Sequence, residues 1–226
     1  MAIIRGPLKL FNDLQADSKI GEHVTAPFVS VTPSGYDPSV NPCILYVGKA
    51  EGGYGAEDRD KFLQCPTIDQ LRKATIKFLE KVNAGKCNTQ FSQFWHLAKL
   101  LSNNKLQNLV WTNICKLSVI GKNGNPTGTL FEVQKDLAIR TLKAEIETYR
   151  PRLVIFVTSD YAESLIRKLV GDCKDISWTK ENDKLWWRKR TKDFPGMLWT
   201  LHPERKPRVL RDRIVQIAQD ILTGPE

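Results

Sequence analysis

The sequence predicts an α/β fold, namely a three-layer α/β/α sandwich around a central parallel sheet of four strands. Four short apolar runs predict the strands, at residues 43–47, 108–112, 153–157 and 197–201. Stretches with helical spacing separate these runs, and strands that alternate with helices are typical of a parallel sheet with helices on both faces. A chain of 226 residues favours one domain over two. We therefore expect a single domain over residues 1–226.

The first part of the chain, residues 1–42, is expected to be largely irregular. Prolines and glycine interrupt its second half at Pro27, Pro33, Gly35, Pro38 and Pro42. A short helix near residues 8–15 is the only regular element that we expect there. The first strand then follows as the apolar run CILYV (43–47), which Gly48 ends.

Two helices are expected between the first and second strands. Thr67 and Gln70 form a T-x-x-Q capping box, which predicts a helix start. Apolar residues then recur at helical spacing, and Gly85 offers a C-terminal stop. A second helix is predicted over 90–102, before the strand at 108–112.

The second half of the chain alternates more clearly. A long helix over about 129–149 should end before Pro151, because the residue that precedes a proline disfavours helix. The run LVIFV (153–157) is apolar throughout, so it predicts a strand buried on both faces. A helix over 160–170 follows it directly.

The last part of the chain begins with a polar and basic insert at residues 174–195, which is rich in tryptophan. The fourth strand at 197–201 and a final helix over about 206–222 complete the predicted fold.

Composition and charge suggest the kind of partner. The formal net charge is +9, and a basic domain of this size most often binds nucleic acid. The alternative is a cationic protein without such a partner. The N-terminus lacks the apolar core of a signal peptide, and no run reaches the roughly 18–20 apolar residues of a membrane span. We therefore expect no membrane association.

The five cysteines point to a reducing compartment. They are odd in number and scattered, and they include no C-x-x-C pair: Cys43, Cys65, Cys87, Cys115 and Cys173. This pattern favours reduced thiols in an intracellular protein, cytoplasmic or associated with the nucleoid. Structural zinc and iron–sulfur sites normally use closely spaced pairs, so we expect neither.

Three strands end in polar groups. They are ILYVGKAEGGYG (44–55), LVWTNICK (109–116) and MLWTLHP (197–203). In an open parallel sheet the carboxyl ends of the strands converge on one crevice, where ligands bind. A Gly-rich turn with Glu51, the amide of Asn113 and the imidazole of His202 should therefore meet there.

These segments, in this order, resemble the uracil-DNA glycosylase superfamily over roughly residues 43–222. VGKAEGGYG is similar to its first motif, a strand followed by a water-activating loop. VWTNICK resembles the second strand of the thermophilic-type branch, and EIETYRP with VIFVTSDYAESLI is similar to a later segment of that branch. LWTLHPERKPR resembles the last motif, which is a strand, a His-Pro pair and a loop that inserts into DNA.

The chain also departs from that family in two places. The thermophilic-type branch carries a four-cysteine iron–sulfur cluster, whereas Cys115 here lacks the other close cysteine pair, so we expect no cluster. The first motif usually offers Asp, Glu or Asn near the start of its loop. Lys49 and Ala50 occupy those places here, and Glu51 is the nearest carboxylate.

The residues of the expected crevice match the needs of N-glycosidic bond hydrolysis. His202 is the candidate donor to the departing base, where negative charge develops. Glu51 is the candidate that holds the attacking water. An amide offers both a donor and an acceptor, so Asn113 fits the reading of a base edge, and the resemblance gives it the same role. Gly48 and Tyr54 are assigned to base binding, Tyr54 by stacking.

Each of these residues also has a plain structural interpretation. His202 precedes Pro203, and such a pair often simply leads into a helix. Asn113 at a strand end is a common turn residue. Glu51 is equally consistent with a solvated charge on a loop.

Several basic and aromatic residues are candidate DNA contacts. The stretch KLWWRKRTK (184–192) mixes Trp186 and Trp187 with five cations, which suits stacking and phosphate contact. The alternative is a surface hairpin whose tryptophans cap the core. Further cations are expected at the mouth of the crevice, at Lys116, Arg205, Lys206 and Arg208.

The sequence therefore predicts a monofunctional DNA glycosylase that removes a flipped-out uracil or modified base and leaves an abasic site. We expect DNA as its partner, a monomeric state, and no metal or organic cofactor. One alternative is an anti-phage defence glycosylase that excises a hypermodified cytosine. Another is a catalytically inactive DNA-binding module of the same fold. A small-molecule enzyme is disfavoured by the positive charge.

Overall fold

The computed structural model describes residues 2–15, 24–32, 36, 44–50, 67–85, 92–104, 106–119, 125–126, 128–171, 178–204 and 207–224. Its α-helices are α1 (Ala2–Gln15), α4 (Ile68–Asn83), α5 (Gln93–Leu101), α6 (Gly128–Tyr149), α7 (Glu163–Gly171) and α8 (Arg208–Thr223). Its strands are β1 (Ile44–Gly48), β2 (Leu109–Asn113), β3 (Leu153–Phe156), β4 (Thr179–Asn182), β5 (Leu185–Arg188) and β6 (Gly196–Thr200). Short 3-10 helices span Leu106–Asn108 and Ser159–Ala162.

All of these strands belong to one sheet, in the order β2-β1-β3-β6-β5-β4. The strands β2, β1, β3 and β6 are parallel neighbours, and they are the four that the apolar runs predict. The expected sheet of four strands is corrected, because β5 pairs antiparallel with β6 and β4 with β5. The protein thus has a mixed α/β fold with a mostly parallel sheet.

The two added strands come from the insert at 174–195. A tight turn joins them, in which the Lys184 N–H donates to Asn182 Oδ1 over 2.8 Å. Leu185 of β5 pairs with Thr200 of β6, and both are buried. The exposed strand β4 is the outermost strand of this edge. The sequence of these strands, TKENDKLWWR, is rich in charged residues, so no apolar run predicts them.

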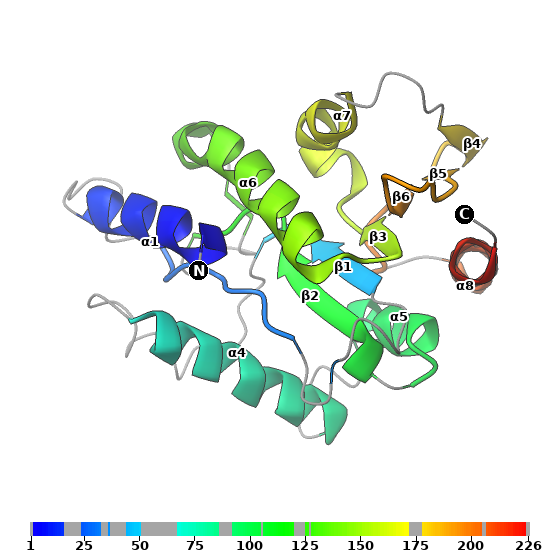
Figure 1. Ribbon diagram of the computed structural model, residues 1–226, viewed down its shortest axis with the longest axis horizontal. Helices are drawn as coiled ribbons and strands as arrows, with labels where there is room; N and C mark the ends of the chain where they lie inside the picture. The colour runs from blue at the N-terminus through cyan, green and yellow to red at the C-terminus, as the bar shows by residue number, and fades with distance from the viewer. Residues whose placement is uncertain are drawn as a thin grey trace.

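Helices cover both faces of the sheet. Ile44 and Tyr46 of β1 point to the face that α4, α5 and α8 cover. Leu45 and Val47 point to the opposite face, which α6 and α7 cover. Figure 1 shows α6 and α7 on one side of the strands and α5 and α8 on the other. The period of two along each strand therefore fixes which residues share a face.

The helix boundaries agree closely with the sequence patterns. The capping box of Thr67 and Gln70 forms at the start of α4, and Gly85 follows its end with a φ of 65°. The helix α1 is longer than expected, beginning at Ala2, and Ile3 in its added first turn packs against the core. The expected helix over 160–170 is instead a 3-10 helix followed by α7.

Candidate active site

The carboxyl ends of the four parallel strands lie at one edge of the sheet. Gly48 and Asn113, the last residues of β1 and β2, are register partners. The Val157 N–H just after β3 donates to the carbonyl of Val47 over 3.0 Å, which holds that strand end beside β1. His202 follows β6 by two residues. The predicted convergence of Gly48, Asn113 and His202 on one edge is therefore present.

Alternation along the strands also places these residues on one face. Asn113 shares a face with Trp111 of β2, and Gly48 shares a face with Tyr46 of β1. Both Trp111 and Tyr46 belong to the core beneath α5. The polar groups at this edge therefore face α5 rather than α6.

Gly48 and Asn113 fit against each other closely. A Cβ atom placed on Gly48 would lie 2.5 Å from Asn113 Oδ1, closer than such atoms approach in proteins. Glycine at this position therefore leaves the space that the amide occupies. Asn113 is 1% exposed, and within the described residues its Nδ2 has no hydrogen-bond partner. A buried amide donor of this kind is costly unless something accepts its hydrogen bond.

Phe94 of α5 connects the two halves of the edge. A Cβ on Gly48 would lie 3.3 Å from Phe94 Cε2, and the ring of Phe94 stacks with that of His202 at 5.9 Å and 20°. The Tyr46 hydroxyl donates to the Phe94 carbonyl over 3.0 Å and fixes the start of α5 on the sheet. The helical spacing of Phe94 marks it only as a core residue, so the sequence indicates no functional role for it.

His202 is held by its backbone while its ring stays accessible. Its N–H donates to Ser159 Oγ over 2.7 Å, and its side chain is 26% exposed. Its Nδ1 lies 3.9 Å from a carboxylate oxygen of Glu204, an exposed neighbour. Phe94 thus supports one side of the imidazole, which remains partly exposed.

Ser159 is a site residue that the sequence patterns did not reveal. It has a φ of 55°, a left-handed conformation that is uncommon for serine. Its carbonyl accepts a hydrogen bond from Trp199 Nε1 over 2.9 Å, and its hydroxyl accepts the one from His202. Such strained residues concentrate at functional sites. The sequence feature that could have indicated Ser159 is the abrupt change from the apolar VIFV to the polar TSD after the third strand.

Four of the predicted site residues lie outside the described residues. They are Glu51, Tyr54, Arg205 and Lys206. The water-holding role of Glu51 and the stacking role of Tyr54 stay predictions. Lys49, just before that segment, has its Nζ 5.9 Å from the centroid of the Tyr161 ring.

Lys116 does not lie at the mouth of the crevice, which corrects its predicted contact with DNA. It is 2% exposed, and its Nζ forms an ion pair with Glu145 of α6 at 2.7 Å. The Thr112 hydroxyl accepts from the same ammonium group, and it also bonds Glu145. Ser30 donates to that carboxylate over 2.7 Å. Lys116 therefore joins the N-terminal segment, β2 and α6.

Burial and ion pairing shift the pKa of Lys116 in opposite directions. Burial lowers the pKa of Lys116 because the charged form loses its hydration, whereas the charge of Glu145 and its hydrogen bond raise it. A buried pair of this kind depends on both partners, since either charge alone would be uncompensated.

The tryptophans of the insert pack onto the core. Trp186 stacks on Trp199 with 4.8 Å between ring centroids and 27° between planes. It borders the cluster beneath α6 and α7, whereas Trp187 borders the opposite cluster. Both side chains are half-buried. This placement favours a hairpin that caps the core over stacking on nucleic acid.

Arg208, by contrast, is exposed as a DNA contact requires. It opens α8 just after the His-Pro segment, and its side chain is 84% exposed near Asp212. The next residue, Val209, is 79% exposed, which is unusual for a large apolar side chain. An exposed apolar residue beside cations at the end of a site is suited to contact unstacked bases.

Cys115 is the cysteine that lies just after β2. Its thiol is free and buried, and it lies 3.7 Å from the Tyr161 hydroxyl. Burial raises the pKa of Cys115 to about 12. In the described segments, no group of three or more His, Cys, Asp or Glu side chains is placed to hold a metal ion.

Comparisons with known proteins assign this chain to no family. No protein-family model matches the chain, and a search of the curated proteins finds no match. Among the helices of the described residues, none combines the length and apolarity needed to cross a membrane.

Proposed function

We propose that this protein is a monofunctional DNA glycosylase that hydrolyses the N-glycosidic bond of a flipped-out uracil or modified base. The proposal rests on one observation. The buried amide of Asn113 and the accessible imidazole of His202 lie at the carboxyl edge of the same sheet. Asn113 and His202 come from strands β2 and β6, three strand spacings apart, or about 14 Å.

In this proposal the amide selects the base and the imidazole assists its departure. The bond between sugar and base breaks, and the base leaves with the bonding electron pair as an anion. An N–H of His202 donates to the base oxygen where that charge gathers. Asn113 Nδ2, which lacks a partner within the described residues, donates to an acceptor on the base edge.

Water completes the reaction on the opposite face of the sugar. It adds to the sugar carbon and loses a proton, and Glu51 is the candidate base that accepts this proton. The products are a free base and an abasic site. The reaction draws on water alone and needs no metal or organic cofactor.

Two further residues act as positioning residues. The Ser159 hydroxyl accepts the His202 N–H, and the Phe94 ring supports the imidazole face. A donor that is already fixed needs little reorganisation when charge develops, and this is the main source of electrostatic catalysis. The strained backbone of Ser159 is consistent with that task.

DNA would approach across the segment that follows β6. Arg208 is the exposed cation in the described part of this segment, with Arg205 and Lys206 just before it. Val209 is suited to fill the space that the flipped nucleotide leaves. In this proposal the parallel strands form the centre of a three-layer α/β/α sandwich, and the β4–β5 hairpin is an addition to it.

The identity of the base divides the proposal into two versions. One is uracil, as in ordinary repair. The other is a hypermodified cytosine in phage DNA, which would make the protein a defence enzyme. The altered first motif, with Lys49 and Ala50 at its start, favours a non-standard pocket.

A catalytically inactive DNA-binding module is the second candidate, favoured by the same altered motif. The two functions differ in one measurement. An enzyme releases free base and creates alkali-labile sites, whereas a binding module only retards DNA on a gel.

The test is incubation of the full chain with duplex DNAs that carry uracil or hypermodified cytosines. Released bases are identified by mass spectrometry, and abasic sites are counted after alkali treatment. His202→Ala should slow release by a factor equivalent to about 2–4 kcal/mol of transition-state stabilisation. His96→Ala is the matched control, because His96 is an exposed histidine of α5. Asn113→Ala should impair the choice of base as well as the rate.

Three outcomes would count against the proposal. If DNA is bound and no base is released from any substrate, the chain is a binding module. If His202→Ala and Asn113→Ala release base at the wild-type rate, the assigned mechanism is wrong. If Glu51→Gln keeps full activity while His202→Ala has none, another group holds the water.

A further inference from the structure

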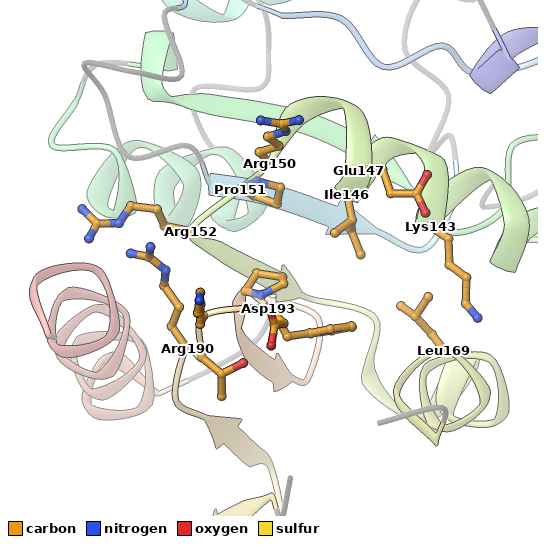
Figure 2. Close-up of a pocket in the computed structure, with 13 residues that line it drawn as sticks. Lys143, Ile146, Glu147, Arg150, Pro151, Arg152, Leu169, Arg190 and Asp193 are labelled. Carbon is orange, nitrogen blue, oxygen red and sulfur yellow. The ribbon is translucent and has the colours of Figure 1, made fainter. Parts of the chain in front are cut away.

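A cavity lies at the edge of the sheet opposite the candidate active site. Its volume is about 670 Å³, and it is lined by the end of α6, the start of β3, Leu169 of α7 and residues 190–195. Figure 2 shows this pocket with its lining side chains. Arg152 precedes β3 and Pro195 precedes β6, whereas Asn113 and His202 follow their strands. The length of a strand, about 13–16 Å, therefore separates the two sites.

The lining of this pocket is strongly cationic. Five of its residues carry positive charge: Lys143, Arg150, Arg152, Arg190 and Lys192. Two carry negative charge, Glu147 and Asp193. Such an excess in a concave site attracts anions.

Two of these cations, Arg152 and Arg190, are placed to bind a ligand. Arg150 directly follows the carboxyl end of α6, which carries partial negative charge. In Figure 2, Arg150 points away from Arg152 and Arg190, whose guanidinium groups lie together at one end of the pocket. Burial, together with the charge of Arg152, lowers the pKa of Arg190. Two like charges held this close favour an anion between them.

The surrounding structure fixes both arginines. The Arg152 carbonyl accepts a hydrogen bond from the Gly196 N–H over 3.0 Å, which ties the start of β3 to the start of β6. Thr191 and Phe194 exchange backbone hydrogen bonds in the turn that follows Arg190. Within the described residues, Arg152 Nε is buried and lacks a hydrogen-bond partner. The backbone at both arginines is thus held in place, and the Arg152 side chain keeps one buried donor that no described residue accepts.

The remaining lining is apolar and partly aromatic. Ile146, Leu169, Phe194 and two prolines contribute to it. The Phe194 ring lies 4.6 Å from the guanidinium carbon of Arg188, a fully buried residue of β5, so the ring is fixed from behind. A pocket of this volume is typical of small-molecule sites. Its chemistry suits a ligand with an anionic end and a flat apolar part.

We propose that this pocket binds a small organic phosphate of nucleotide size, with its phosphate on Arg152 and Arg190 and its base against Phe194. The planar guanidinium group suits this task because it donates two parallel hydrogen bonds to phosphate oxygens. The site is separate from the proposed glycosylase site and stands independently of it.

The test is calorimetric titration of the full chain with adenosine triphosphate, inorganic triphosphate and adenosine. We expect adenosine triphosphate to bind, inorganic triphosphate to bind more weakly, and adenosine alone to bind weakest. Arg152→Gln and Arg190→Gln should each weaken binding about tenfold or more, the loss expected for a charge-assisted contact. Arg140→Gln removes the same charge from an exposed position on α6 outside the pocket, and should change affinity less than about twofold.

Several results would overturn the proposal. One is the absence of binding by either triphosphate at millimolar concentration. Another is an equal loss of affinity in Arg140→Gln, which would show attraction by overall charge alone. If Arg152→Gln and Arg190→Gln instead weaken binding of a DNA duplex, and adenosine triphosphate competes with that duplex, the pocket belongs to a DNA surface. Thermal melting of each variant separates loss of binding from loss of folding.

Discussion

At the residue scale, Lys116 and His202 are two titratable side chains in opposite environments. Lys116 is enclosed with Glu145, whereas His202 keeps its ring accessible. Both follow buried strands in the sequence, and both are polar residues just beyond an apolar run. Their difference arises because the elements that cover them, α6 and α5, provide a carboxylate in one case and an aromatic ring in the other.

The buried pair should behave as a structural unit. We expect Glu145→Ala to destabilise the fold by about 3–5 kcal/mol, because it leaves the Lys116 ammonium uncompensated in the interior. The measurement is the urea dependence of unfolding by circular dichroism. Lys116→Met combined with Glu145→Leu should cost much less than Glu145→Ala alone. A loss below about 1 kcal/mol in Glu145→Ala would show that the pair is hydrated and that Lys116 is free to serve DNA.

The contact between Gly48 and Asn113 should appear as an interaction energy. Gly48→Ala should cost about 1–3 kcal/mol of stability and disturb base selection, because its Cβ would lie 2.5 Å from Asn113 Oδ1. In the background of Asn113→Ala, the same change should cost far less. A double-mutant cycle with denaturant unfolding and base release measures this coupling. Equal costs in both backgrounds would contradict the placement of the amide.

At the element scale, the β4–β5 hairpin is the feature that changes the interpretation of the sequence most. Its tryptophans were candidates for contact with DNA, and they lie half-buried against the two faces of the core. The hairpin extends the sheet beyond β6 and thereby supports the strand that His202 follows.

The role of the hairpin can be tested at Trp186. Trp186→Ala should lower stability by about 2 kcal/mol, because it removes the ring that stacks on Trp199 and leaves a space. Trp186→Phe keeps an aromatic ring and should cost less. DNA affinity, measured by fluorescence anisotropy at a temperature where both variants are folded, should stay within about twofold of wild type. A tenfold loss of affinity in Trp186→Phe would restore the stacking interpretation.

At the scale of the whole molecule, the cations behind the net charge of +9 lie in several different environments. Lys116 and Arg188 are buried, Arg152 and Arg190 line the pocket between α6 and residues 190–195, and Arg208 is exposed near the candidate active site. The overall charge therefore overstates the number of cations that can meet DNA at one surface.

This distribution makes a quantitative prediction for DNA binding. Affinity should fall steeply with salt, because bound Lys and Arg side chains release counterions from DNA. Arg208→Gln should reduce the slope of log affinity against log salt by about 0.9, the value for one lost phosphate contact. Arg205→Glu with Lys206→Glu should weaken binding to all sequences alike. Arg140→Gln should leave the slope unchanged, and an affinity that is independent of salt would contradict nucleic acid as the partner.

The sequence by itself determined the parallel strands, the ends of the main helices and the edge at which polar groups meet. These features are local: apolar runs such as LVIFV, the Thr67 capping box and the break before Pro151 act through neighbouring residues. Alternation along a strand then fixes which face Asn113 occupies.

Only the tertiary structure decided what those residues meet. The burial of Lys116 depends on Glu145, 29 residues away, and on Ser30, 115 residues before Glu145. The insert became strands because an open edge of β6 was available for pairing, although its own sequence is charged. The support of His202 comes from Phe94 and Ser159, on other elements. Contacts between distant segments form only when the chain is folded, because no local pattern specifies which partner each side chain meets.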